Sequence, residues 1–349
     1  MKALRWHGPR DLRLTELIEP ALETGEVRLR VAYCGICGSD LHEYHDGPHA
    51  IPVERPHPLS CAQAPITLGH EFCGTVVETA SARLAVGMRV AVEPEYRCGT
   101  CEFCRTGRYN LCRFMGFVGL MGDGGMAQTV VVPEYTVHPL PDDVSFEQAA
   151  VFEPAAVALH AVRQARLRPG NACVVLGLGP IGLLLVAMLR RSGAGRIVAI
   201  DIAPARLEMA GRLGADVIVD ARKQDTRSAV LRATDDEGAA LTFEAAGTQT
   251  TLDAALACLR KGGRAVLVGL MGRASLDAFD FVNRELGLCS SVGYRNVYPT
   301  LIEWTASGQI DPSAIITRKV ALEHAVPLGF DALLDDKSQI KVLVAPEGD

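Results

Sequence analysis

The sequence predicts an α/β protein of two domains, an antiparallel barrel-like β-domain followed by a doubly wound parallel sheet. The 349 residues suffice for two domains of ordinary size. Short β-like runs broken by Gly and Pro fill the chain up to about residue 150. Strands then alternate with helices, which is typical of a parallel sheet.

Composition narrows the class of protein. The chain is 48% hydrophobic and 22% charged, with a formal net charge of -6 and no basic block, which argues against nucleic-acid or anionic-membrane binding. The start, MKALRWHGPRDLRL, lacks the apolar core of a signal peptide, and the longest apolar run, 181–189, is too short to span a bilayer. We therefore expect a soluble cytoplasmic protein with small-molecule partners.

Each predicted element follows from a local pattern. Strands are expected in the runs 26–37, 71–79, 88–94 and 126–133, which alternate or stay apolar over strand lengths. Apolar residues at three- and four-residue spacing predict a helical segment over 145–165. Strand and helix then alternate: 171–179, 196–201, 216–220, 241–247, 264–270 and 286–293 read as strands, and 180–193 and 204–214 as helices.

A glycine-rich turn lies between the strand at 171–179 and the helix that follows it. Gly177, Gly179 and Gly182 fit G-x-G-x-x-G, with Pro180 and Ile181 between them. In this context the motif predicts a dinucleotide-binding (Rossmann) turn, in which a pyrophosphate meets the free N–H groups of a helix N-terminus. The alternative is a plain strand–turn–helix connection without a ligand.

Asp201 ends the next strand, at the place where a carboxylate binds the adenosine ribose hydroxyls and repels a 2′-phosphate. This favours NAD over NADP. Arg206 lies nearby and offers a positive charge to the same part of a cofactor, which leaves NADP as the alternative. Asp201 is also placed to cap the helix that begins near Pro204.

Four cysteines lie close together in CGTCEFCRTGRYNLC: Cys98, Cys101, Cys104 and Cys112. With 11 cysteines in a long chain without a secretion signal, metal binding is more plausible than a disulfide framework. Four thiolates at this spacing match a closed, structural zinc site. An iron–sulfur cluster is the alternative.

A charged residue interrupts the apolar run VFEPAAVALH. The Glu153 carboxylate needs a basic side chain, a proton or a metal if it is buried. Cys37 in CGSDLH and His70 in GHEF offer a thiolate and an imidazole, so the three residues together could bind a catalytic zinc with one position open. For His70 alone, a structural hydrogen-bonding role is the ordinary alternative.

The motifs CGICGSDLH, LGHEF, FEPAAVALHAV and GLGPIG, together with the four cysteines, resemble those of the zinc-containing medium-chain dehydrogenases. The resemblance covers nearly the whole chain and is strongest to the (R,R)-butanediol dehydrogenases, with sorbitol and threonine dehydrogenases as relatives. It implies a GroES-like catalytic domain at 1–150, completed by 294–349, and an NAD-binding domain at 151–293.

The resemblance also implies roles for single residues. Cys37, His70 and Glu153 would hold a catalytic zinc and the four cysteines a structural one, which makes two zinc ions per subunit. Ser39 takes the place of the hydroxyl that receives the substrate proton, and His42 that of the histidine that passes it on. Glu71 matches the carboxylate that follows the zinc histidine.

The implied reaction is the NAD-linked interconversion of a secondary alcohol or vicinal diol with its ketone, in first place 2,3-butanediol and acetoin. A sorbitol-type polyol dehydrogenase or an L-threonine dehydrogenase is the alternative. The apolar strand at 286–293 is expected at a sheet edge that pairs with its copy, which predicts a homodimer or homotetramer.

Overall fold

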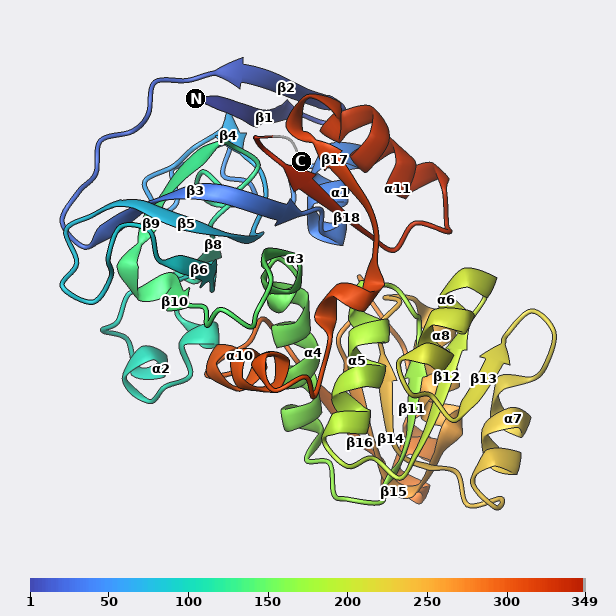
Figure 1. Cartoon of the computed structure of the whole chain (residues 1–349). Coiled ribbons are helices and arrows are strands. Elements are labelled where there is room, and N and C mark those ends of the chain that lie inside the picture. Colours follow the sequence, from blue (N-terminus) through green and yellow to red (C-terminus); the bar gives the residue numbers. More distant parts are fainter. Residues whose placement is uncertain (348–349) are drawn as a thin grey trace. The chain divides into compact units, whose positions relative to one another are not determined.

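The computed structural model describes residues 1–347, and the chain divides into two compact units (Figure 1). Unit 1 joins Met1–Glu153 to Tyr298–Asp349, and unit 2 is Pro154–Val297. Each unit buries its own cluster of apolar side chains. The mixed α/β class predicted from the sequence is confirmed: unit 1 is largely antiparallel β-structure and unit 2 contains a parallel sheet.

Unit 1 is built on a sheet with the strand order β10-β6-β5-β3-β18-β17, in which β9 also pairs with β3. Its strands are β3 (Glu26–Gly35), β5 (Glu71–Thr79), β6 (Arg89–Val92), β9 (Thr129–Pro133), β10 (Val137–Pro139), β17 (Ile316–Ala321) and β18 (Lys341–Ala345). Shorter sheets join β2 (Asp11–Glu16), β1 (Lys2–Gly8) and β4 (Ile66–Thr67), and β7 (Glu95–Tyr96) with β8 (Gly116–Phe117).

The barrel-like core of unit 1 follows from alternation along these strands. In β3, Val27, Leu29 and Val31 point inward with the period of a strand; on the other face Arg30 is exposed, and Arg28 is covered where it pairs with Glu78. Trp6 and Phe72 are buried in the same cluster. The fold therefore holds the ends of β3 and β5 on a rigid support.

Unit 1 also contains short helices and turns. They are α1 (Gly38–Asp46), α2 (Glu102–Arg105), α3 (Phe146–Ala149), α10 (Tyr298–Ala306) and α11 (Ala332–Asp335), with 3₁₀ turns η1 (Tyr109–Leu111), η2 (Glu134–Thr136), η3 (Pro312–Ile315) and η4 (Leu322–His324), and the π-helical turn η5 (Ala325–Asp331). Of these, α1 and the loop around α2 and η1 carry candidate site residues.

The helical segment predicted over 145–165 is interrupted. It consists of α3 and α4 (Phe152–Ala165), separated at residues 150–151. Pro154 explains the break, because its ring would clash with the carbonyl of Ala150 in a continuous helix and it has no N–H to donate. In the first turn of a new helix Pro154 is tolerated, and Glu153 consequently lies at the start of α4.

Unit 2 has a parallel sheet in the order β13-β12-β11-β14-β15-β16. Its strands are β11 (Ala172–Leu176), β12 (Arg196–Asp201), β13 (Val217–Asp220), β14 (Ala239–Glu244), β15 (Leu259–Leu267) and β16 (Gly287–Ser290). Its helices besides α4 are α5 (Pro180–Arg191), α6 (Pro204–Arg212), α7 (Thr226–Ala233), α8 (Gln249–Cys258) and α9 (Ala278–Asn283).

The strand order places a reversal beside β11. The chain runs from β11 outward to β12 and β13, then returns to β14 on the other side of β11. Right-handed crossovers therefore put α5 and α6, which contact each other, on one face, and α7 and α8 on the other (Figure 1). Ligands of such sheets bind outside the strand ends at this reversal.

Candidate functional site

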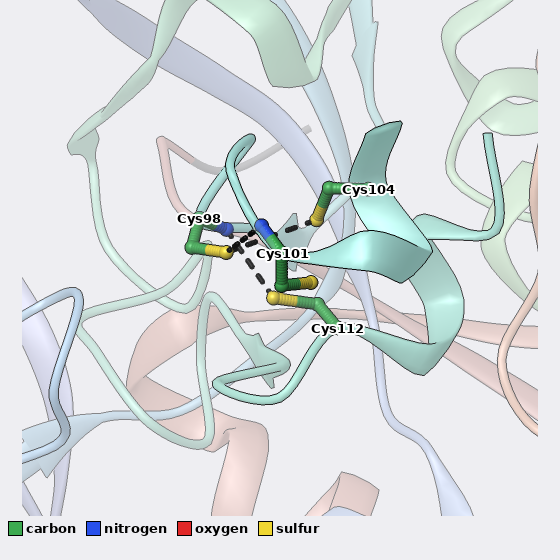
Figure 2. A group of neighbouring side chains, drawn as sticks. All are labelled: Cys98, Cys101, Cys104 and Cys112. Atoms are coloured by element: carbon green, nitrogen blue, oxygen red, sulfur yellow. Dashed lines mark hydrogen bonds between the residues drawn. The ribbon is translucent and has the colours of Figure 1, made fainter. Parts of the chain in front are cut away.

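The four predicted cysteines come together in the loop around α2 and η1. The sulfur atoms of Cys98, Cys101, Cys104 and Cys112 all lie within 4.8 Å of one another and face a common centre (Figure 2). Cys98 Sγ and Cys104 Sγ are 4.0 Å apart, close to the roughly 3.8 Å edge of a tetrahedron with Zn–S bonds of about 2.3 Å. The donor set and its spacing fit a tetrahedral metal with four thiolate ligands.

Main-chain N–H groups prepare part of this cluster for the thiolate form. The amides of Cys101 and Thr100 lower the pKa of Cys98 to about 6. The main-chain N of Cys98 and of Phe114 both donate to the sulfur of Cys112, at 3.3 and 3.4 Å. Burial instead raises the pKa of Cys104 to about 12. A bound cation would favour the thiolate form of all four cysteines.

A second group of metal-binding side chains gathers where β3 and β5 lie side by side. Ligand atoms of Cys37, His70 and Glu71 all lie within 4.8 Å of one another. Gly35, the last residue of β3, pairs in register with Glu71, the first of β5. The strand pairing therefore brings Cys37, two residues after β3, next to His70, the residue before β5.

His70 is oriented by a carboxylate. Its Nδ1 lies 3.5 Å from Oδ1 of Asp40, and the Oγ of Ser39 lies 3.3 Å from its Nε2. Burial disfavours a charged ring, but the negative charges of Asp40 and Cys37 outweigh it and raise the pKa of His70. A carboxylate on one ring nitrogen leaves the other for a metal, an arrangement common among metal-binding histidines.

Asp40 was not among the residues selected from the sequence. It is fully buried and its Oδ2 accepts a hydrogen bond from the main-chain N of Cys37 at 2.9 Å. It therefore holds the main chain of Cys37 and places a negative charge beside His70. Its place inside CGSDLH, between the predicted Ser39 and His42, was the available signal.

Lys341 was also missed by sequence reasoning. Its Nζ is buried and donates to both oxygens of Glu71, at 2.6 and 2.8 Å, and to the carbonyl of Ile36 at 2.9 Å. Burial opposes its charge, but Glu71, Cys37 and Glu153 outweigh that and raise the pKa of Lys341. A lysine inside the apolar run IKVLVAP was the sequence signal.

Glu153 lies outside the close group formed by Cys37, His70 and Glu71. Its side chain is 6% exposed at the start of α4. Its negative charge acts on Lys341, so the carboxylate is within electrostatic reach of the same site. Of the two glutamates, Glu71 contributes to the close group and is ion-paired, while Glu153 stands further from it.

The predicted proton-relay residues share one helix. Ser39 and His42 both lie on α1, and positions three apart on a helix are neighbours on its surface. Ser39 is half-buried and next to His70, whereas His42 is exposed. The exposed imidazole of His42 therefore lies on the same side of α1 as Ser39, where it is placed to take up a proton from Ser39.

The glycine-rich turn follows β11 and ends in α5. Gly177 has φ +87°, and a Cβ on it would lie 2.7 Å from the Cβ of Ala246. A Cβ on Gly182 would lie 1.8 Å from the carbonyl oxygen of Gly177, so close packing requires glycine there. Gly179 is the N-cap of α5 and faces open space, with Pro180 and then Ile181 as the first helical residues. The N-terminus of α5 is thus accessible to an anion.

Asp201 ends β12 beside this turn. Its Oδ2 accepts from the main-chain N of Leu178 at 2.6 Å, and its Oδ1 accepts from Ile202 and Ala203 at 2.7 and 2.8 Å. The carboxylate is therefore held against the glycine-rich turn. Arg206 lies in the first turn of α6, and its Nε is buried without a hydrogen-bond partner among the described residues. These residues fit a dinucleotide.

No helix within residues 1–347 is long and apolar enough to cross a membrane.

Comparison with protein families identifies both parts of the chain. Residues 23–142 match the alcohol dehydrogenase GroES-like domain, and residues 180–307 match the zinc-binding dehydrogenase domain. Among curated proteins, the chain is 41% identical to (R,R)-butanediol dehydrogenase of Bacillus subtilis over 99% of this chain and 100% of that protein. It is 36% identical to sorbitol dehydrogenase of the same organism, over 99% and 97%.

Comparison with solved structures also finds dehydrogenases of this family. The crystal structure of 2R,3R-butanediol dehydrogenase from Bacillus subtilis matches with a TM-score of 0.94 at 40% identity, covering 99% of both chains. A zinc-binding dehydrogenase from Sinorhizobium meliloti, bound to NADP, matches with a TM-score of 0.89 at 29% identity and the same coverage. The chain therefore belongs to the zinc-binding alcohol dehydrogenase family and is an oxidoreductase.

Proposed function

We propose that the protein is a zinc-dependent, NAD-linked dehydrogenase that interconverts (R,R)-2,3-butanediol and acetoin. The observation that carries the substrate assignment is the 41% identity to a butanediol dehydrogenase over the whole of both chains. The cluster of Cys37, His70 and Glu71, with Ser39 beside the histidine, supports the chemistry.

Cys37, His70 and Glu153 are the proposed ligands of a catalytic zinc, with Glu71 as the alternative carboxylate. The Asp40 contact leaves Nε2 of His70 for the metal. Lys341 favours the assignment to Glu153, because it already neutralises Glu71 from close range. Cys98, Cys101, Cys104 and Cys112 are the proposed ligands of a structural zinc, since four thiolates leave no position for substrate.

Held by these residues, a zinc ion would supply Lewis-acid polarisation of the alcohol oxygen, and a bound NAD would supply the acceptor for a hydride from the carbinol carbon. Ser39 Oγ would accept the hydroxyl proton of the alcohol as it releases its own hydroxyl proton, and His42, exposed three residues further along α1, would pass that released proton to solvent. Asp40 holds His70 in one orientation throughout. The apolar barrel core keeps these side chains on a rigid support.

Asp201 is the proposed determinant of NAD as the cofactor. A carboxylate there accepts hydrogen bonds from ribose hydroxyls and repels a 2′-phosphate. Its three main-chain donors support the role, because they hold the carboxylate in place before a cofactor arrives. Comparing kcat/KM with NAD and with NADP tests the assignment, and a preference for NADP would overturn it.

The second candidate function is that of a sorbitol-type polyol dehydrogenase, supported by the 36% identity to a sorbitol dehydrogenase. The two candidates share the metal and the cofactor, so only the substrate separates them. NADH formation should be measured with butanediol, sorbitol and threonine, and NADH consumption with acetoin. We expect the highest kcat/KM for butanediol and acetoin. A higher value for sorbitol or threonine would transfer the assignment.

The protein is proposed to form a homodimer or a homotetramer through the edge of the parallel sheet. β16 is the last strand in the sheet order and carries the exposed Leu288, and the preceding helix α9 carries the exposed Phe279 and Val282. An unpaired apolar edge is a liability that a second copy would remove. Light scattering coupled to size-exclusion chromatography should give at least twice the monomer mass. A monomer at micromolar concentration would contradict this.

A further inference from the structure

A second carboxylate stands beside Asp201 at the carboxyl end of the parallel sheet. β13 pairs in parallel with β12 (Figure 1). Asp220 is the register partner of Asp201. The main-chain N of Ala221 donates to the main-chain oxygen of Asp201 at 3.1 Å. Residues in register on neighbouring strands point to the same face of a sheet, so the two carboxylates are neighbours.

Both carboxylate oxygens of Asp220 accept hydrogen bonds from Arg222, two residues later in the chain. Its Oδ1 accepts from Nε of Arg222 at 3.0 Å and its Oδ2 from Nη2 at 2.8 Å, which makes a bidentate ion pair. The main-chain N of Arg222 also donates to Oδ1, and Lys223 Nζ lies 3.6 Å from Oδ2. The hydrogen bonds from Arg222 hold the pKa of Asp220 below its usual range.

Arg222 also lies within electrostatic reach of Asp201. Its pKa is raised chiefly by the hydrogen bond to Asp220, and the charge of Asp201 adds to that effect. The side chain is half exposed, so it can change partner without breaking the core. An arginine at this place in a dinucleotide fold is suited to bind a 2′-phosphate, since its planar fork matches phosphate geometry.

We propose that Asp220 is a specificity-determining residue for the cofactor, because it holds Arg222 in a closed ion pair and adds a second negative charge beside Asp201. The inference rests on the proposed NAD-linked function and extends it. A 2′-phosphate entering this region would meet two carboxylates and an arginine whose fork is already occupied. Asp201 and Asp220 therefore both disfavour NADP. Asp220 does so partly by its own negative charge and partly by keeping Arg222 in the ion pair.

The test compares the dissociation constants of NADH and NADPH on the full-length, zinc-loaded protein. Asp220→Asn removes the charge and weakens the hold on Arg222 with little change of shape. We expect it to shift the affinity ratio toward NADPH on the order of tenfold or more. In Asp220→Asn/Arg222→Gln the gain in relative NADPH affinity should shrink to the part that comes from removing the charge of Asp220. The gain should also shrink as salt rises, which a merely structural effect would not do.

Asp225→Asn is the matched control. It removes the same charge, three residues beyond Arg222, and Asn still caps α7 as Asp225 does through the N–H of Ser228. Its affinity ratio should equal that of the wild type. Asp220→Ser provides a second variant at the test position, and thermal unfolding of every variant checks that unit 2 remains folded.

An unchanged ratio in both Asp220 variants would overturn the role of Asp220. A gain that is undiminished by Arg222→Gln would overturn the part played by Arg222. Adenosine 2′,5′-bisphosphate and AMP repeat the comparison without nicotinamide or substrate. A failure of the Asp220 inference can be distinguished from a failure of the proposed NAD-linked function. Tighter binding of NADPH than NADH by the wild type would refute NAD as the cofactor, whereas normal NADH binding with an unshifted ratio refutes the Asp220 inference alone.

Discussion

The buried ion pair of Lys341 and Glu71 provides a sharp stability prediction. Lys341→Met keeps an unbranched side chain that lacks only the terminal charged atom, which leaves the Glu71 carboxylate buried without its cation. Lys341 is 1% exposed and Glu71 is 0% exposed, with 2.6 Å between Nζ and Oε2. Breaking a buried pair from one side costs about 3–5 kcal/mol of unfolding free energy, out of about 5–15 kcal/mol for a typical domain.

The chain offers a matched control at its surface. Lys2 and Glu323 are 2.7 Å apart, nearly the same distance, but both are about two-fifths exposed. Lys2→Met should therefore cost less than about 1 kcal/mol. The two variants differ mainly in burial, so the difference between them isolates the cost of an uncompensated buried charge.

Urea unfolding followed by tryptophan fluorescence is the suitable assay. Both tryptophans, Trp6 and Trp304, lie in unit 1, which also contains both lysines. The double variant Glu71→Gln/Lys341→Met should recover much of the loss, because neither charge is then left alone. If Lys341→Met were no less stable than Lys2→Met, the reasoning about the buried pair would be refuted.

Three further predictions concern the metal sites and pH. Glu153→Ala should lose the catalytic zinc and at least about a hundredfold in kcat/KM, whereas full zinc content and turnover in this variant would assign the third ligand to another residue such as Glu71. Cys104→Ser should lower the zinc content from two to one per subunit and unfold at a lower temperature; an unchanged zinc content would rule out the four-cysteine site. Burial, then Arg295 and Arg163, lower the pKa of His160 to about 4, so the unfolded chain takes up a proton near pH 6.5 that the folded chain refuses until about pH 4. As the pH is lowered from about 6.5 to about 4, the unfolding free energy should therefore fall by up to about 3 kcal/mol. In His160→Gln, the plot of unfolding free energy against pH, measured by circular dichroism, should be flatter over this range.

Local patterns were enough to predict the fold class. Period-two runs marked β3, β5, β6 and β9, and the glycine-rich turn marked the strand–helix junction at the start of α5. The helical segment over 145–165 was less accurate, because the apolar spacing continues across a break that Pro154 imposes. Periodicity reports which face is buried, and it does not report a steric clash within the main chain.

Partners far apart in the sequence could not be predicted in the same way. Lys341 and Glu71 are separated by 270 residues, and only the pairing of β18 with β3 and of β3 with β5 brings them together. Asp40 lay within a motif already selected, but its contact with His70 depends on the same strand pairing. The sequence placed Glu153 at the start of a helix with Pro154 in its first turn, and α4 begins at Phe152. It did not show that Glu71, and not Glu153, lies in the close group with Cys37 and His70.

The central claim is tested most directly by NADH formation from (R,R)-2,3-butanediol, measured for the zinc-loaded wild type and for Cys37→Ala. The wild type should reduce NAD with this diol, and Cys37→Ala should lose the activity while keeping the four-cysteine zinc and its native thermal unfolding. An inactive wild type, or a Cys37→Ala variant with undiminished turnover, would contradict the account.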